Sequence, residues 1–179
     1  MANKLYTMDF SFYTTFGVYD VEAQCQIAKE IGFDGLEMAV WDGTRWPAVR
    51  ALDVLQPRYD LDPVGAYVVL NLDLPLEHPH NAGILTMLER IVPGAMVDLA
   101  IQSAGRGLAP SSEAGDAAVV DWLRQAVTVC ARRDVQLLLY PHVTFWMERH
   151  ADCIRLCDQV GHPNLGIVLV AIHWYVERR

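Results

Sequence analysis

Residues 64–72 read VGAYVVLNL, and this valine-rich run decides the class of fold. β-branched and aromatic residues favour a strand. The apolar residues follow one another without the alternation of a half-exposed strand, so both faces of this strand are predicted to be buried. A strand buried on both faces is typical of a parallel sheet that is covered by helices. The run therefore predicts an α/β protein.

Similar apolar runs occur on both sides of this one, separated by stretches with helical spacing. Strands are predicted over residues 5–12, 36–41, 64–72, 95–102, 135–140 and 166–175, and helices over residues 21–31, 46–55, 82–91, 116–132 and 150–160. Asp20 has the character of an N-cap for the first helix, and Gly32 ends it. Strands about 30 residues apart suit successive right-handed βα units. Because no linker interrupts residues 1–179, a single domain is predicted.

Two architectures share this order of elements. An open, doubly wound sheet usually has a glycine-rich turn after its first strand. Here that turn reads SFYTTFGVYD, residues 11–20, without a GxGxxG pattern. An eight-stranded barrel fits the local patterns, although two strands and three helices of a complete barrel are not found in this sequence.

The overall charge excludes several classes of partner. The 179 residues carry a net charge of −8, from 22 acidic and 14 basic residues, and the basic ones are scattered. A chain without a basic stripe is a poor candidate for gripping nucleic-acid phosphates. No apolar run reaches the roughly 18 residues of a membrane helix, and the start, MANKLY, lacks the apolar segment of a signal peptide. We therefore expect a cytoplasmic protein that binds neither nucleic acid nor membrane.

The four cysteines are predicted to be reduced thiols in the core. Cys153 and Cys157 are four residues apart on one predicted helix, a spacing that suits a shared metal. No CxxC motif occurs, and nothing near this pair completes a tetrahedral site.

Two stretches resemble a known family. They are IAKEIGFDGLEMAVWDG at residues 27–43 and LLLYPHVTFWMERHADCIRLCDQVGHPNLGIVLVAIHW at residues 137–174. With the strand spacing, they are similar to the sugar phosphate isomerase/epimerase family, the xylose-isomerase-like group of TIM barrels. The most specific parts of this resemblance are the motif at Gly32–Glu37 and the run GHPNLGIVL at residues 161–169.

The resemblance implies a TIM-barrel-like domain over residues 1–179 with about six parallel strands and five helices, incomplete relative to an eight-stranded barrel. It also implies proton transfer next to a carbonyl of a sugar or sugar phosphate. Members typically hold one divalent metal, such as Mn, Mg, Co or Zn, at the C-terminal mouth of the barrel. Such a metal neutralises the charge of the enediolate formed in the reaction.

The sequence departs from the family at its metal-ligand positions. Where the family often has Leu-Glu-Pro, this chain has Leu139-Tyr140-Pro141, and where it often has Asp-x-x-His, this chain has Val170-Ala-Ile-His173. Tyr140 and Val170 therefore stand at two acid positions, and the remaining ligands of the family pattern have no counterpart here. The metal is left undecided, as is whether the chain is an enzyme.

Candidate site residues are the polar and aromatic ones at the predicted C-terminal ends of the strands. The proposed catalytic residues are His173, His142 and Glu37, and the proposed substrate-binding residues are Trp41, Asn71, Tyr140 and Trp174. Other interpretations stay open for these residues. The two histidines are first explained as rim residues bonded to backbone, and less readily as ligands of a replacement metal with Glu37 or Glu148. The aromatic residues are equally explained as a cap on the core.

Six strands cannot close a standard barrel, so the first and last predicted strands would have unpaired edges. A second copy of the chain or another polypeptide could pair with those edges, or the six strands could rearrange into an open sheet. A truncated descendant of an enzyme is a further explanation for the missing strands. The alternative function is a non-catalytic sugar-binding or assembly protein. A DNA-repair endonuclease is disfavoured because such enzymes need several metals and a basic groove.

Overall fold

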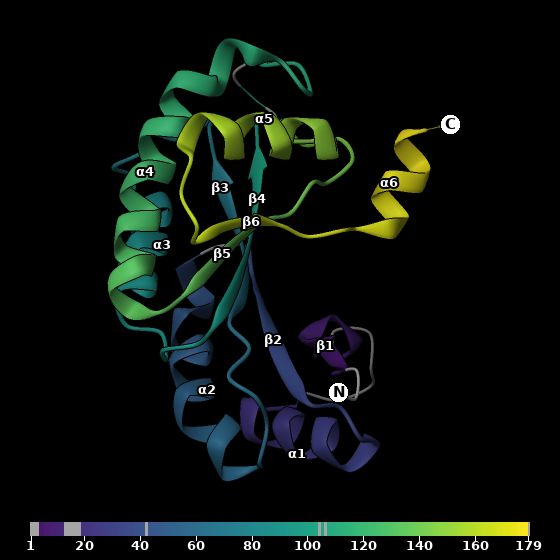
Figure 1. Ribbon diagram of the computed structural model, residues 1–179. Coiled ribbons are helices and arrows are strands. Elements are labelled where there is room, and N and C mark those ends of the chain that lie inside the picture. Colours follow the sequence, from purple (N-terminus) through teal and green to yellow (C-terminus); the bar gives the residue numbers. More distant parts are fainter. Residues whose placement is uncertain (1–3, 13–18, 42, 104, 106, 179) are drawn as a thin grey trace.

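The computed structural model describes residues 4–12, 19–41, 43–103, 105 and 107–178, which form one parallel sheet of six strands. The strands lie side by side in sequence order: β1 (Tyr6–Met8), β2 (Gly35–Val40), β3 (Ala66–Asn71), β4 (Met96–Gln102), β5 (Gln136–Leu139) and β6 (Leu165–Ile167). The sheet curves without closing (Figure 1), so in the described part of the chain β1 and β6 each have a neighbour on one side only.

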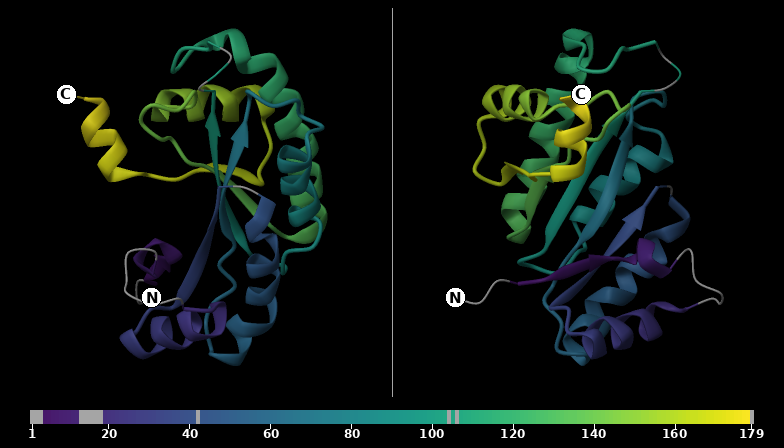
Figure 2. Two further views of the ribbon diagram at one scale, coloured as in Figure 1. Left: turned by 180° about the vertical axis from the view of Figure 1, so that it is seen from behind. Right: turned by 90° about the vertical axis from the view of Figure 1, so that its right-hand side faces the viewer.

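A helix follows each of the first five strands, as βα repetition predicts. The helices are α1 (Val21–Ile31), α2 (Trp46–Arg58), α3 (Pro79–Leu88), α4 (Asp116–Arg133) and α5 (His150–Val160), with short 3-10 turns η1 (Asp9–Phe12), η2 (Gly43–Arg45) and η3 (Glu113–Gly115). They cover the outer face of the curved sheet, whereas β1 and the C-terminal segment lie on the opposite side from α2–α4 (Figures 1 and 2). In the part of the chain that the structure describes, no helix is long and apolar enough to span a membrane.

The ends of α1 confirm the predicted caps. The Asp20 carboxylate accepts the backbone N–H of Ala23 at 2.8 Å, which satisfies one of the free donors of the first turn. Gly32 ends the helix with φ at 102°, a left-handed conformation that glycine adopts without steric cost.

The main core lies between the outer face of the sheet and the helices. Leu36, Val68 and Leu99, from three neighbouring strands, are each 0% exposed there. The inner face is buried as well, through Tyr67 and Val69 on β3 together with their neighbours Ala39 and Ala100. Burial on both faces confirms the interpretation of residues 64–72 and explains why these strands lack polar alternation.

The last predicted strand is wrong beyond its first residues. Residues 166–175 were expected to be extended, but β6 ends at Ile167 and a sixth helix, α6 (Ala171–Glu177), follows. Past β6 the Val168 N–H donates to the Leu139 carbonyl, where β5 ends, and among the described residues no strand lies on the other edge of β6. The Val170 N–H donates to the His150 ring at 3.3 Å, and helix formation then pairs backbone groups that lack a strand partner, beginning with the Trp174 N–H and the Val170 carbonyl.

Asn81 on α3 anchors the end of β3. Its side chain is 0% exposed, and its amide Nδ2 donates to the carbonyls of Asn71 at 2.9 Å and Pro75 at 3.0 Å. Its Oδ1 accepts the backbone N–H of Asn71 at 3.0 Å. One side chain therefore fixes both the last residue of the strand and the loop that follows it.

Replacing Asn81 with Ala is expected to lower the free energy of unfolding by about 1–3 kcal/mol, since the N–H and carbonyl of half-buried Asn71 and the carbonyl of exposed Pro75 lose their partner. Urea denaturation followed by circular dichroism measures this loss. Gln125→Ala is the control, because Gln125 is exposed on α4 and makes one long bond within its own helix. A loss below about 0.5 kcal/mol for Asn81→Ala would contradict the anchoring role.

Candidate functional site

Two carboxyl groups point into the inner face of the sheet. Glu37 lies on β2 and is 8% exposed, and Asp98 lies on β4. Between them on β3, Tyr67 is in register with both Ala39 and Asp98. Residues in register on neighbouring strands project to the same face, which brings Tyr67 and the two acids together on the concave side.

Burial controls the acidity of this pair. Removal from water raises the pKa of Glu37 well above its usual range, and the negative charges of Asp98 and Asp9 raise it further. Removal from water also raises the pKa of Asp98 to about 7. Neither carboxyl group has a hydrogen-bond or ion-pair partner among the described residues. Without a cation to stabilise the charged form, a proton is held on this pair near neutral pH.

Tyr67 adds an unused polar group to the same face. Its side chain is 2% exposed, and its hydroxyl has no hydrogen-bond partner within the described part of the chain. Burial is the main reason that the pKa of this phenol is raised. A buried hydroxyl without a partner costs free energy that a bound polar ligand would recover.

Aromatic rings form a wall beside the acids. The ring centroid of Tyr67 lies 5.5 Å from that of Trp41 and 5.0 Å from that of Tyr140. Phe145, in the loop after β5, lies 6.4 Å from Trp41. Two predicted substrate-binding residues, Trp41 and Tyr140, are thus in one cluster with Tyr67. Trp41 is 42% exposed, so part of the wall faces solvent.

The two predicted catalytic histidines meet at the rim of this wall. The rings of His142 and His173 are 4.1 Å apart between centroids, and the His173 ring is 6.0 Å from that of Tyr140. His173 reaches this place from α6 and not from the end of a strand, which corrects its predicted position. Burial and the neighbouring ring of His142 lower the pKa of His173. A ring nitrogen of His142 is bonded to the Val143 carbonyl at 2.7 Å.

Comparison with known proteins identifies the family. The family model described as xylose isomerase-like TIM barrel matches residues 25–179. The chain belongs to this family. A comparison with curated proteins finds no match.

Solved structures show the same fold. The IOLI protein with a bound zinc atom has a TM-score of 0.72 at 15% identity, with 97% of this chain and 64% of that chain covered. L-ribulose 3-epimerase has a TM-score of 0.70 at 16% identity, covering 98% of this chain and 63% of that one. The probable 3-DHS dehydratase AsbF from Bacillus anthracis gives 0.68 at 16% identity, covering 98% and 66%. The chain thus spans less than two thirds of the length of these structures.

The remaining predicted site residues are placed differently. The Asn71 side chain accepts the backbone N–H of Asp73 at 2.9 Å, so its oxygen supports the loop after β3. Trp174 on α6 is 40% exposed, and the Arg178 guanidinium lies 4.5 Å from its ring centroid. The structure does not join these two residues to the cluster of Trp41 and Tyr140 by any ring contact among the described residues. Their roles in substrate binding stay predictions.

Asp9 links the strand that carries Glu37 to the start of α2. It is 0% exposed, accepts the Ala39 N–H at 2.9 Å and forms an ion pair with Arg45. These contacts tie the turn after β1 to β2 and to the start of α2. Because Asp9 is ion-paired with Arg45, Glu37 and Asp98 are the acids on the inner face, among the described residues, that remain available to bind a ligand.

The described residues do not fit the metal site that is typical of the family. A phenol stands at one expected acid position, Tyr140, and burial raises its pKa, which disfavours the phenolate that a metal would need. The other position is Val170, which has no donor atom in its side chain. Within the described ranges, no three His, Cys, Asp or Glu side chains are grouped to hold a metal ion.

Asp98 and Tyr67 were missed in the analysis of the sequence. Asp98 is the single charged residue inside β4, MVDLAIQ, which is the same signal that singled out Glu37 in β2. A charge within a doubly buried strand demands a partner or a raised pKa, and this reasoning applied equally to both. Tyr67 carried no separate signal, because aromatic residues are ordinary in strands.

The stability of the protein is expected to depend on Asp98 in a pH-dependent way. Between the pKa of an unfolded aspartate, about 4, and the folded value of about 7, the folded state binds more protons than the unfolded state. The free energy of unfolding therefore falls as the pH rises through this window and levels off above it. Asp98→Asn removes the cost of charging, so it should stabilise the protein by about 1–4 kcal/mol at pH 7.5 and change little at pH 4.

Urea denaturation at both pH values measures this effect, with Asp158→Asn on the exposed side of α5 as the matched control. If Asp98→Asn and wild type lose stability equally between pH 4 and 7.5, burial does not control the ionisation of Asp98.

Proposed function

We propose that this protein is of the sugar isomerase/epimerase type and that Glu37 and Asp98 move a proton next to a substrate carbonyl. The observation that carries the proposal is the pair of desolvated carboxyl groups, without partners among the described residues, on the inner face of a xylose isomerase-like sheet. General acid and base groups work best when their pKa lies near the working pH, and burial brings Asp98 to about 7.

The proposed step balances within the pair. The ionised carboxylate removes the proton from the carbon beside the carbonyl, and the protonated partner donates its proton to the carbonyl oxygen, which gives an enediol. For isomerisation, the carboxyl group that took the proton delivers it to the neighbouring carbon, and its partner removes the proton from the other oxygen of the enediol. For epimerisation, the protonated partner instead gives its proton to the opposite face of the same carbon, and the first carboxyl group keeps the proton that it removed. Mutual repulsion favours one proton shared between the two acids, which supplies one base and one acid at the same time.

The surrounding residues suit a sugar. The exposed ring of Trp41 and the half-buried ring of Tyr140 offer apolar faces to the C–H groups of a sugar ring, and the buried ring of Tyr67 packs against both. The unpaired Tyr67 hydroxyl suits a sugar hydroxyl. His142 and His173 lie at the rim, where neutral imidazoles donate or accept hydrogen bonds. These features support either a free sugar or a sugar phosphate as the substrate.

Deuterium exchange tests the proposal. L-ribulose 3-epimerase and D-allulose 3-epimerase are two solved structures with this fold, so L-ribulose and D-allulose are the first ketoses to try. In D₂O the protein is expected to exchange the hydrogen beside the carbonyl, detected by proton NMR. Glu37→Gln and Asp98→Asn should each slow the exchange by about 100-fold, whereas Glu30→Gln on the exposed face of α1 should not. Equal exchange rates in all four proteins would contradict the assignment of Glu37 and Asp98 as the proton-transferring groups.

A non-catalytic sugar-binding protein is the alternative, favoured by Tyr140 and Val170 at the family's acid positions. This alternative predicts that a ketose binds saturably to the aromatic wall and that chelators do not affect the binding. It also predicts that the hydrogen beside the carbonyl does not exchange with D₂O. Calorimetric titration of wild type and Trp41→Ala tests the wall, which both functions need. The exchange experiment separates the two functions, because only the first produces exchange.

We also propose that a second chain, either another copy or a separate polypeptide, covers the open edges at β1 and β6. Near β6 the apolar side chains of Leu169, Ile172 and Val176 are 74%, 69% and 51% exposed. Edges and apolar patches of this kind favour association.

Light scattering is expected to show self-association of the purified protein, because none of the described residues covers the sheet edges at β1 and β6 or buries the apolar side chains of α6. Leu169→Glu/Ile172→Glu should reduce the measured mass to that of one chain. Ile31→Glu/Val54→Glu is the matched control, since these two apolar residues are equally exposed but lie on α1 and α2. A monomeric wild type would leave a separate polypeptide as the covering chain, and equal loss in the control would contradict a role for α6.

A further inference from the structure

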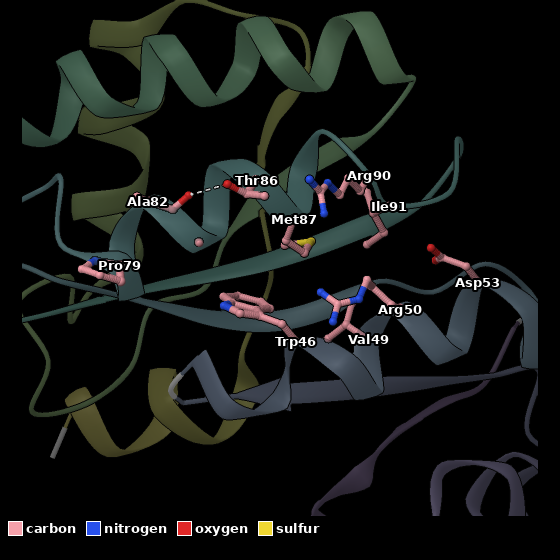
Figure 3. A pocket seen from close by; sticks show the side chains of 11 residues that line it. Trp46, Val49, Arg50, Asp53, Pro79, Ala82, Thr86, Met87, Arg90 and Ile91 are labelled. Atoms are coloured by element: carbon pink, nitrogen blue, oxygen red, sulfur yellow. Dashed lines mark hydrogen bonds between the residues drawn. The ribbon is translucent and has the colours of Figure 1, made fainter.

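A cavity of about 330 Å³ lies between α2 and α3 on the outer, helical side of the sheet (Figure 3). Its apolar lining comes from Trp46 and Val49 on one side and Met87 and Ile91 on the other. The volume is at the lower end of the range for small-molecule sites. Because Glu37 and Asp98 face the inner side of the sheet, this cavity is separate from the candidate site described above.

The cavity exists because neighbouring helices do not pack uniformly. α1 packs on α2, α3 on α4, and α4 on α5, but α2 and α3 make fewer contacts with each other. At one end the Trp46 indole closes against Gly83, where an added Cβ would lie 2.7 Å from its Nε1. The half-buried indole thus packs between the start of α2 and α3, and the groove lies on the far side of the indole.

Two arginines line this groove from opposite walls, Arg50 from α2 and Arg90 from the turn after α3 (Figure 3). Neither guanidinium has a carboxylate partner within the ranges that the structure describes. Of the other arginines that the structure describes, Arg45, Arg58, Arg124, Arg149 and Arg155 are ion-paired, whereas Arg132, Arg133 and Arg178 are not. Two unpaired cations in one groove are notable in a chain with a net charge of −8.

The one acid that lines the groove is held at its far end. Asp53 lies beyond Arg50 and Ile91 in Figure 3. Burial raises the pKa of the Asp53 carboxyl group, and the backbone of Val92 and the charge of Arg133 partly offset this rise. The groove therefore presents positive charge in its middle and apolar surface toward Trp46.

We infer that this groove is a binding site for an amphipathic phosphate monoester, with a flat apolar body against Trp46 and Met87 and the phosphate between Arg50 and Arg90. Two monocations match a phosphate that carries close to two negative charges at neutral pH. The planar guanidinium binds phosphate oxygens in pairs. The apolar walls supply the burial that inorganic phosphate alone does not provide.

Calorimetric titration with 1-naphthyl phosphate tests the site, with 1-naphthol and inorganic phosphate as partial ligands. The ester is expected to bind saturably and at least tenfold more tightly than either partial ligand. Arg50→Gln/Arg90→Gln should weaken the ester by at least tenfold. Arg124→Gln/Arg132→Gln removes the same charge from the exposed face of α4 and should leave the affinity within about twofold.

Three results would overturn the inference. They are no saturable binding of the ester up to millimolar concentration, equal loss of affinity in the two arginine pairs, or loss in Trp41→Ala with none in Arg50→Gln/Arg90→Gln. The last result places the ester on the inner face and not in the groove between α2 and α3.

Discussion

The in-register parallel pairing of β3 with β4 is the interaction on which the rest of the structure depends. Five consecutive residue pairs, from Tyr67 with Asp98 to Asn71 with Gln102, hold these central strands together. Each further strand adds at the outside in sequence order, so the right-handed crossovers put α1–α5 on one face. The other face is thereby left for side chains and a ligand.

The same pairing produces the chemistry of the inner face. Register places Asp98 beside Tyr67 and two residues from the level of Glu37, in a setting where Ala39, Val69 and Ala100 exclude water. A positively charged side chain at this place would form ordinary ion pairs with the carboxyl groups and keep them ionised. None of the described residues supplies one, and Arg45 is already engaged by Asp9. Proton affinity near neutral pH is therefore a consequence of packing and not of any special residue type.

The open sheet accounts for the unusual C-terminal segment. Between Val168 and Glu177 the chain has apolar residues that a wider sheet would bury, yet α6 has no buried residue. α6 nevertheless carries His173 to His142, which a straight continuation of β6 was predicted to do. The convergence of the two rings thus survives a change of secondary structure, because the segment after β6 runs past the end of β5 in either case.

The sequence by itself determined the α/β class, the order of strands and helices, the caps of α1 and the exact bounds of α5, since hydrophobic periodicity and capping chemistry are local. It also singled out Glu37, Trp41, Tyr140 and the two histidines. Only the tertiary structure decided that Asp98 and Tyr67 join them, that Asn71 supports a loop, and that residues 171–177 are helical. The physical reason is that register, desolvation and the lack of a neighbouring strand depend on residues far away in the chain, which no local pattern records.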